Sequence, residues 1–179
     1  MHATPGVEEG GEQMRILGID PGLGITGYGL IEACGNNVRL IEAGIVRSNA
    51  KEKLEKRLAS LYKKIINLIE DTMPEAVVLE ELYSHYKHPK TSILMAHGRA
   101  AICLAVEHRG VALVNYPSTK IKKAITGHGR ASKEQMQRTV TSLLGLKSPP
   151  EPVDVTDALA LAITHANIWG HRYDLQGYR

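Results

Sequence analysis

Hydrophobic residues follow two different spacings along the 179-residue chain, and each spacing predicts a different kind of element. Where apolar residues run together over a short stretch between turn-forming residues, the pattern is typical of β-strands. Such runs occur at 14–20, 25–33, 38–47, 76–80 and 111–116. The Gly-Asn-Asn sequence after the second run indicates a hairpin to the third. The run 76–80 is apolar enough for a strand that is buried on both faces of a sheet.

Between the strands, apolar residues return every three or four positions, which predicts amphipathic helices. In the clearest case, which ends before Pro74, one helical face carries Leu54, Leu58, Leu61, Ile65 and Leu68. Further helices are predicted at 92–108, 119–125, 132–144 and about 154–167. Ser132 and Gln135 have the spacing of a capping box. The order of elements predicts an α/β fold with a five-stranded mixed sheet flanked by helices.

We expect one folded domain over residues 14–168, a flexible leader over 1–13 and a loose tail over 169–179. The leader has three Glu and neither Lys nor Arg, so it does not read as a signal peptide. No run approaches the ~18 apolar residues of a membrane span. Cys34 and Cys103 form no CxxC pair and are expected to be reduced. These features predict a cytoplasmic protein with no membrane partner.

Composition excludes several classes of protein, and the charge becomes informative when successive segments of the chain are counted separately. With 43% apolar and 23% charged residues, the sequence excludes a disordered, collagen-like or disulfide-scaffold protein. The net charge is only +3. Residues 1–83, however, hold 9 Lys and Arg against 13 Asp and Glu, whereas residues 84–139 hold 10 against 2. The basic middle of the chain is therefore a candidate surface for a polyanion, although a solvated basic face would give the same count.

Four carboxylates stand where ordinary surface charge does not explain them. Asp20 ends the first predicted strand and Glu80 ends the fourth, while Asp154 and Asp157 lie three residues apart at the start of the last helix. Asp20 could instead form a turn before Pro-Gly. Asp154 could be a helix cap, with Asp157 favoured by the helix dipole. Taken together, the four acids point to a shared site, because strand ends of an open α/β sheet converge on one crevice.

Such a cluster predicts a metal site, because like charges about 4 Å apart repel by ~4 kcal/mol at an effective dielectric near 20. Ligation by carboxylates alone is typical of Mg²⁺ or Mn²⁺ rather than zinc. Two such ions ~3.5–4 Å apart form the clamp that nucleases and polymerases place on a phosphodiester. We therefore expect two Mg²⁺ ions per subunit, with Mn²⁺ able to substitute.

The basic residues that would flank this acidic crevice are candidates for phosphate contacts with DNA. They are Lys120, Lys122, Lys123, Arg130 and Lys133. Tyr83 follows Glu80 in a loop with further basic residues, where an aromatic ring could stack on an unpaired base. A mobile loop with incidental aromatic residues is an equally good interpretation of this segment.

Four motifs together resemble the RuvC family of bacterial Holliday-junction resolvases, from about Met14 to Asn167. They are ILGIDPGLGITGYGLI (16–31), VVLEELY (77–83), MAHGRAAICLAV (95–106) and VDVTDALALAITHA (153–166). The resemblance implies a ribonuclease-H-like fold, a homodimer, and Mg²⁺-dependent cutting of two symmetric strands at a four-way junction. It also implies partnership with the branch-migration proteins RuvA and RuvB.

The resemblance assigns roles to individual positions. The family's four catalytic carboxylates fall on Asp20, Glu80, Asp154 and Asp157. Its loop aromatic falls on Tyr83, where a Phe is known in some members, and its DNA-contacting lysines are similar to Lys122 and Lys133. The helix 95–108, rich in small residues, resembles the family's dimer helix. Glu81 beside Glu80 leaves open which of the two points inward, because successive residues of a strand face opposite sides.

The leading hypothesis is a metal-dependent endonuclease that resolves Holliday junctions in DNA recombination and repair, leaving a 5′-phosphate and a 3′-hydroxyl. The segment Asp-Pro-Gly-x-Gly-x-Thr at 20–26 also resembles the phosphate loop of actin/Hsp70-type phosphotransferases, which need two such halves. Two further alternatives are a non-catalytic junction-binding protein and a related nuclease that acts on structured RNA.

Overall fold

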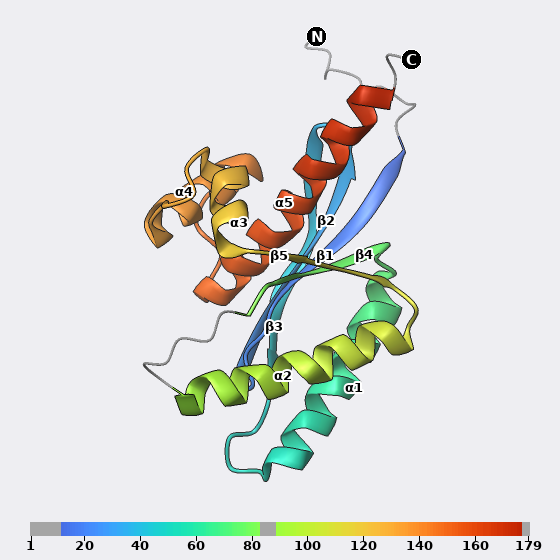
Figure 1. The fold of residues 1–179 in the computed structure, drawn as a ribbon, viewed down its shortest axis with the longest axis vertical. Helices are drawn as coiled ribbons and strands as arrows, with labels where there is room; N and C mark the ends of the chain where they lie inside the picture. Colours follow the sequence, from blue (N-terminus) through green and yellow to red (C-terminus); the bar gives the residue numbers. More distant parts are fainter. Residues whose placement is uncertain (1–11, 83–88, 177–179) are drawn as a thin grey trace.

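In a computed structural model, which describes residues 12–82 and 89–176, five strands form one mixed sheet in the order β3-β2-β1-β4-β5 (Figure 1). The strands are β1 (Gln13–Asp20), β2 (Ile25–Cys34), β3 (Asn37–Arg47), β4 (Ala76–Glu80) and β5 (Ala112–Tyr116). The first three are antiparallel neighbours, whereas β4 pairs in parallel with both β1 and β5. The predicted five-stranded mixed sheet is confirmed.

Helices cover both faces of this sheet, as Figure 1 shows. They are α1 (Leu54–Thr72), α2 (Pro89–His108), α3 (Ser118–Thr126), α4 (Lys133–Leu143) and α5 (Val153–Gln176). One hydrophobic cluster lies between the sheet and the α1–α2 pair, and a second lies between the sheet and α3, α4 and α5. The sheet is therefore the middle of three layers, in accord with the continuous apolar run of β4.

The central strands send successive side chains to opposite faces, and this alternation decides which acids reach α5. Ile16 and Val78 belong to the cluster under α5, whereas Leu17 and Leu79 belong to the cluster under α1 and α2. Residues two positions further along a strand return to the same face. The last residues of β1 and β4 therefore face the α5 side of the sheet.

Glycines in β1 and β2 allow α5 to lie directly on the strand backbone. A methyl group at Gly18 would come within 1.9 Å of the carbonyl oxygen of Ala158, and one at Gly27 within 2.1 Å of that of Asp154. Gly27 is the cross-strand partner of Asp20. The first turn of α5 is thus pressed against the sheet at the end of β1.

The start of α4 is fixed by the predicted capping box. The backbone N–H of Gln135 donates to Ser132 Oγ at 3.2 Å, and the backbone N–H of Ser132 donates to Gln135 Oε1 at 2.8 Å. Two N–H groups that a helix end leaves unpaired are satisfied in this way. Lys133 is the first residue of the helix and is held at a defined end of it.

Helix α5 is longer than the sequence pattern indicates. It continues to Gln176 instead of ending near Asn167, so residues 169–176 extend the helix where a loose tail was expected. Gly170 allows the extension, because a methyl group there would lie 3.0 Å from the carbonyl oxygen of Gly35 in the β2–β3 turn. Across residues 12–82 and 89–176, no helix has the length and apolar character needed to span a membrane.

Candidate active site

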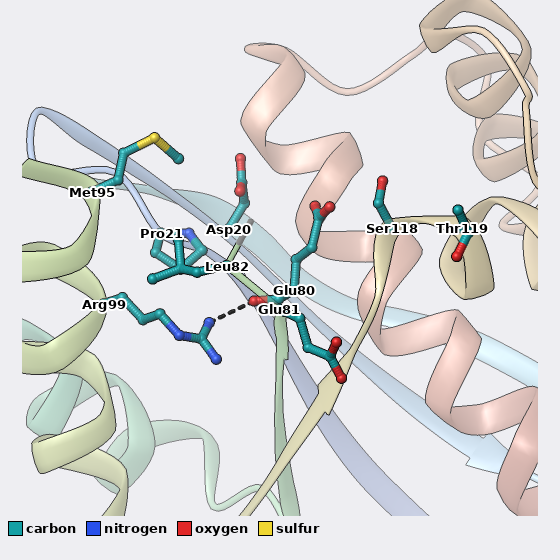
Figure 2. Close-up of a pocket in the computed structure, with 9 residues that line it drawn as sticks. All are labelled: Asp20, Pro21, Glu80, Glu81, Leu82, Met95, Arg99, Ser118 and Thr119. Carbon is teal, nitrogen blue, oxygen red and sulfur yellow. Dashed lines mark hydrogen bonds between the residues drawn. The ribbon is translucent and has the colours of Figure 1, made fainter. Parts of the chain in front are cut away.

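Two of the predicted acids, Asp20 and Glu80, lie side by side at the carboxyl edge of the sheet. β1 and β4 are parallel neighbours, with Ile19 opposite Leu79, so the next residue of each strand reaches the same edge. Figure 2 shows both carboxylates extending into one hollow, while the Glu81 side chain points to the opposite side. In this structure Glu80 therefore faces Asp20, as the alternation of β4 requires.

The other two acids come from the amino-terminal end of α5. Asp154 lies over Gly27, which pairs with Asp20 across the sheet. Asp157 follows one helical turn later and is partly buried. Both are close enough to Asp20 to perturb its ionisation. The structure thus brings together all four acids that the sequence singled out.

Electrostatics at this edge disfavour full ionisation. Burial raises the pKa of Asp20 to about 7, and the negative charges of Asp157, Asp154 and Glu80 contribute to the rise, while Lys133 opposes it. Burial also raises the pKa of Asp157; Glu80 and Asp154 add to that rise, and Lys133 and Lys122 oppose it. The site holds more negative charge than it can keep without a proton or a cation.

The donor chemistry suits a hard divalent cation. Carboxylate oxygens are the ligands that Mg²⁺ and Mn²⁺ prefer, and soft thiolate ligands are not among the groups that meet here. In the described parts of the chain, no three His, Cys, Asp or Glu side chains lie close enough together to hold an ion. The carboxylates would have to turn toward a common point to share a cation, a change in side-chain rotamers that their half-exposed positions permit.

A hollow of about 430 Å³ opens beside Asp20 and Glu80, between the sheet edge and helices α2 and α3 (Figure 2). It is lined by Asp20, Pro21, Glu80, Glu81, Leu82, Met95, Arg99, Ser118 and Thr119. The hydroxyl groups of Ser118 and Thr119 and the carboxylates stand on one side, and Met95 and Arg99 of α2 on the other. A polar substrate that entered here would meet the carboxylates directly.

The predicted basic residues divide into two groups. Lys133 acts electrostatically on both Asp20 and Asp157, and Lys122 acts on Asp157, so these two lysines border the acids. Lys120 lies over the ring of Tyr116, with its Nζ 4.8 Å from the ring centroid.

The remaining candidates lie elsewhere. Lys123 is exposed on α3. Arg130 lines a separate hollow of about 440 Å³, together with His128 and Arg138. Tyr83, the predicted stacking residue, falls outside the described residues.

Sequence reasoning missed Arg99 and its partner Asn115. The Arg99 guanidinium donates to the backbone carbonyl of Glu80 at 2.6 Å and also to Asn115 Oδ1. A signal was present, because Arg99 is the one Lys, Arg, Asp or Glu between Ser92 and Val106 in a helix otherwise made of small and apolar residues. Charged residues in such surroundings usually have a specific partner.

Comparison with known proteins identifies the family. The family model described as "Crossover junction endodeoxyribonuclease RuvC" matches residues 16–165. The chain belongs to the RuvC family. The Moorella thermoacetica crossover junction endodeoxyribonuclease RuvC is 44% identical over 161 residues, which cover 89% of this chain and 96% of that protein.

Solved RuvC structures share the fold. The Thermus thermophilus RuvC structure superposes with a TM-score of 0.81 at 30% identity and covers 89% of this chain and 97% of its own. T. thermophilus RuvC in complex with Holliday junction substrate gives a TM-score of 0.78 at 27% identity, with 87% and 95% coverage. The predictions of the family, the ribonuclease-H-like fold and a nuclease of the hydrolase class are confirmed. As a RuvC family member, the chain is a crossover junction endodeoxyribonuclease.

Proposed function

We propose that Asp20, Glu80, Asp154 and Asp157 are the catalytic, metal-binding carboxylates with which this member of the RuvC family hydrolyses DNA phosphodiesters at Holliday junctions. The observation that carries the assignment is their meeting at one edge of the sheet, where burial, together with the neighbouring carboxylates, raises the pKa of Asp20 to about 7. A cluster of this kind is stable near neutral pH only with protons or cations. In a nuclease, the cation also serves the reaction.

Mg²⁺ is the metal we propose, with two ions per subunit and Mn²⁺ able to substitute. Two divalent cations held by these carboxylates would supply activation of a water molecule and stabilisation of the leaving 3′ oxygen in an in-line displacement. Asp20 is the central ligand of this proposal, because three other carboxylates perturb it. Lys133 opposes the rise in the pKa of Asp20 and of Asp157, and Lys122 opposes the rise in the pKa of Asp157. These two lysines would bind the phosphate that is cut. The products would be a 5′-phosphate and a 3′-hydroxyl.

The DNA-binding surface of the proposal runs outward from the acids over α3 and α4. Lys120, Lys122, Lys123 and Lys133 supply positive charge along this path. Arg130 adds to it in the hollow that it shares with His128 and Arg138, which also has the hydroxyl groups of Thr126 and Thr139 in its wall. Arginine and hydroxyl donors suit phosphate oxygens. We retain Tyr83 as the residue that stacks on a junction base.

A homodimer is part of the same proposal, because symmetric paired nicks need two sites. On α2, Ile93, His97, Ala100 and Leu104 are exposed and are spaced by four, three and four residues, which puts them in one stripe along the helix. Ile93 is 56% exposed and Leu104 is 64% exposed. A second copy of α2 would cover this stripe, and the small Ala100 would let the two helices approach closely.

The cellular part of the proposal rests on the family alone. RuvA and RuvB would deliver the junction, and the cytoplasm would be the site of action. Residues 14–168 would form the nuclease domain, which agrees with the family match to 16–165.

One gel experiment tests the proposed function. A synthetic four-way junction and a matched linear duplex are incubated with the protein, with and without Mg²⁺. We expect paired nicks in the junction alone, only with the metal. Asp20→Asn should abolish cutting while junction binding in a gel shift persists. Normal Mg²⁺-dependent cutting by Asp20→Asn would overturn the site assignment, and preferential cutting of structured RNA would favour the RNA-nuclease alternative.

A further inference from the structure

Arg99 is a charged residue in the middle of a helix that otherwise carries small and apolar side chains. It lies on α2, is half-buried, and reaches the carboxyl edge of the sheet (Figure 2). Burying part of a guanidinium is unfavourable unless its N–H groups find acceptors. The contacts of Arg99 therefore indicate what holds it there.

Those contacts join the ends of two strands. Nη1 donates to the carbonyl oxygen of Glu80 at 2.6 Å, and Nη2 donates to Asn115 Oδ1. Asn115 lies opposite Leu79 in the β4–β5 ladder, and Glu80 lies opposite Tyr116. Because the guanidinium is planar and rigid, two such hydrogen bonds fix both position and orientation. Arg99 thus holds the backbone of Glu80 at a set distance from α2.

The preceding residue of α2 packs against the turn that follows the other acid-bearing strand. A methyl group at Gly98 would lie 3.4 Å from the backbone nitrogen of Leu23 and 3.6 Å from its Cα, which are van der Waals contact distances. Leu23 belongs to the turn that follows Asp20. Residues 98 and 99 of α2 therefore touch the backbone after β1 and the backbone at the end of β4.

We infer that Arg99 is a positioning residue that sets the spacing between Asp20 and Glu80 by tying the Glu80 backbone to α2. The inference rests on the proposed function, in which Glu80 is a metal ligand. It assigns Arg99 no contact with substrate or metal. It also makes α2 a connection between the proposed dimer contact and the acids. One side of this helix carries the exposed stripe, and the other side holds the acids in register. The stripe consists of Ile93, His97, Ala100 and Leu104.

The test compares Arg99→Met with Arg99→Lys and with Arg109→Met. Arg109 follows the last residue of α2 and forms an ion pair with Glu70 at 2.9 Å, far from the acids, so its replacement is a matched loss of one arginine. Four quantities are measured: the melting temperature, the Kd for junction without metal, kcat, and the Kd for Mn²⁺ by electron paramagnetic resonance. Mn²⁺ binding is read without any cleavage.

We expect Arg99→Met to weaken Mn²⁺ binding and to lower kcat by about 10-fold each, as loss of a group that orients a ligand does. Junction affinity without metal should stay within twofold, because the hydrogen bonds of the Arg99 guanidinium go to Glu80 and Asn115 of the protein itself. Arg99→Lys should recover part of the loss, because the ammonium keeps the charge and N–H donors but lacks the planar fork that spans both acceptors. Arg109→Met should match the wild type in all four measurements.

Two results would overturn the inference. One is Arg99→Met with wild-type Mn²⁺ affinity and kcat; the other is a lower melting temperature with unchanged Mn²⁺ affinity, which is what a purely structural role gives. If Arg99→Met does not fold, Asn115→Ala decides, since it removes one acceptor and should weaken Mn²⁺ binding in the same direction but less. Loss of cutting in Asp20→Asn alongside wild-type behaviour of Arg99→Met would keep the proposed function and reject the inference.

Discussion

Asp20 differs from the other acidic residues of the chain in how strongly its ionisation depends on its neighbours. Burial and three nearby carboxylates raise its pKa to about 7, and Lys133 offsets only part of the rise. Below this pH the group is largely protonated in the folded protein, whereas an unfolded Asp is ionised above about pH 4. A single residue thus couples the protonation state of the site to the stability of the fold.

The first prediction concerns pH. Because the folded pKa of Asp20 lies above the unfolded value, the folded state binds the extra proton, and stability falls as pH rises from about 4 to about 7. In metal-free protein, Asp20→Asn removes this loss. As pH rises from 4.5 to 7.5, the free energy of unfolding of the mutant should increase by ~2 kcal/mol or more relative to that of the wild type. Calorimetry should show the melting temperature of the mutant rising relative to that of the wild type by about 4 °C or more over this pH range. A difference in melting temperature that does not change with pH would contradict the pKa shift.

The second prediction separates two adjacent glutamates. Glu80 points toward Asp20 and Glu81 points away (Figure 2). Glu80→Gln should lower junction cleavage by roughly 100-fold or more, the scale of removing a ligand to a catalytic metal. Glu81→Gln changes the same charge one residue along and should leave the rate within about twofold. Equal losses in initial-rate assays of the two variants would show that the orientation of β4 does not govern the chemistry.

Among the elements, the contact between α5 and β2 leaves little room for change. The backbone of Asp154 rests on Gly27, and a methyl group there would come within 2.1 Å of the Asp154 carbonyl oxygen. The strand therefore sets how closely the amino-terminal end of α5, which carries Asp154 and Asp157, approaches the sheet. Two acids of the site depend on a residue with no side chain.

The third prediction uses this contact. Gly27→Ala should destabilise the protein by about 1–3 kcal/mol through overpacking, and it should reduce cleavage further than the stability loss alone explains, because α5 must move. Gly24→Ala is the control: Gly24 is exposed and has no atom within 4 Å of an added methyl group. Urea unfolding and junction cleavage measure both effects. Normal cleavage by a folded Gly27→Ala would show that the site tolerates a shifted α5.

Local pattern was enough to predict the elements, but contacts between distant segments were not accessible to it. The five strands and five helices follow from apolar spacing, and the four acids follow from their places at element ends. The isolated charge of Arg99 was visible in the sequence, but its role was missed because its main acceptor is a backbone carbonyl, which leaves no pattern of residue types. The extension of α5 was missed because Gly170 reads as a helix breaker, whereas here it accommodates the β2–β3 turn.

At the scale of the whole molecule, one face of α2 has no cover within the described chain. Large apolar side chains stand exposed along it, led by Leu104 at 64% and Ile93 at 56%. The opposite face of the same helix packs in the cluster with α1 and contributes Ile102 and Val106 to it. The proposed dimer would place the outer face under a second copy.

The fourth prediction follows from that face. Leu104→Glu should convert the dimer into a monomer, because the new charges would be buried without partners in the contact. Paired cutting of junctions should fall with it. Leu143→Glu, at an exposed leucine of α4, is the matched control and should stay dimeric. Light scattering after size exclusion chromatography measures the molecular mass directly. A dimeric Leu104→Glu variant would show that the dimer interface is not on this face of α2.

β1 pairs with β4, and α5 packs on both strands. This arrangement also determines when the enzyme becomes active during its synthesis. The acids of the site span residues 20 to 157, so the site depends on contacts between segments far apart in sequence. The segment that forms α5 must leave the ribosome before it can dock over Gly27 and complete the set of acids. We therefore expect unfinished chains to be unable to cut DNA, which makes completion of the fold a safeguard for the genome.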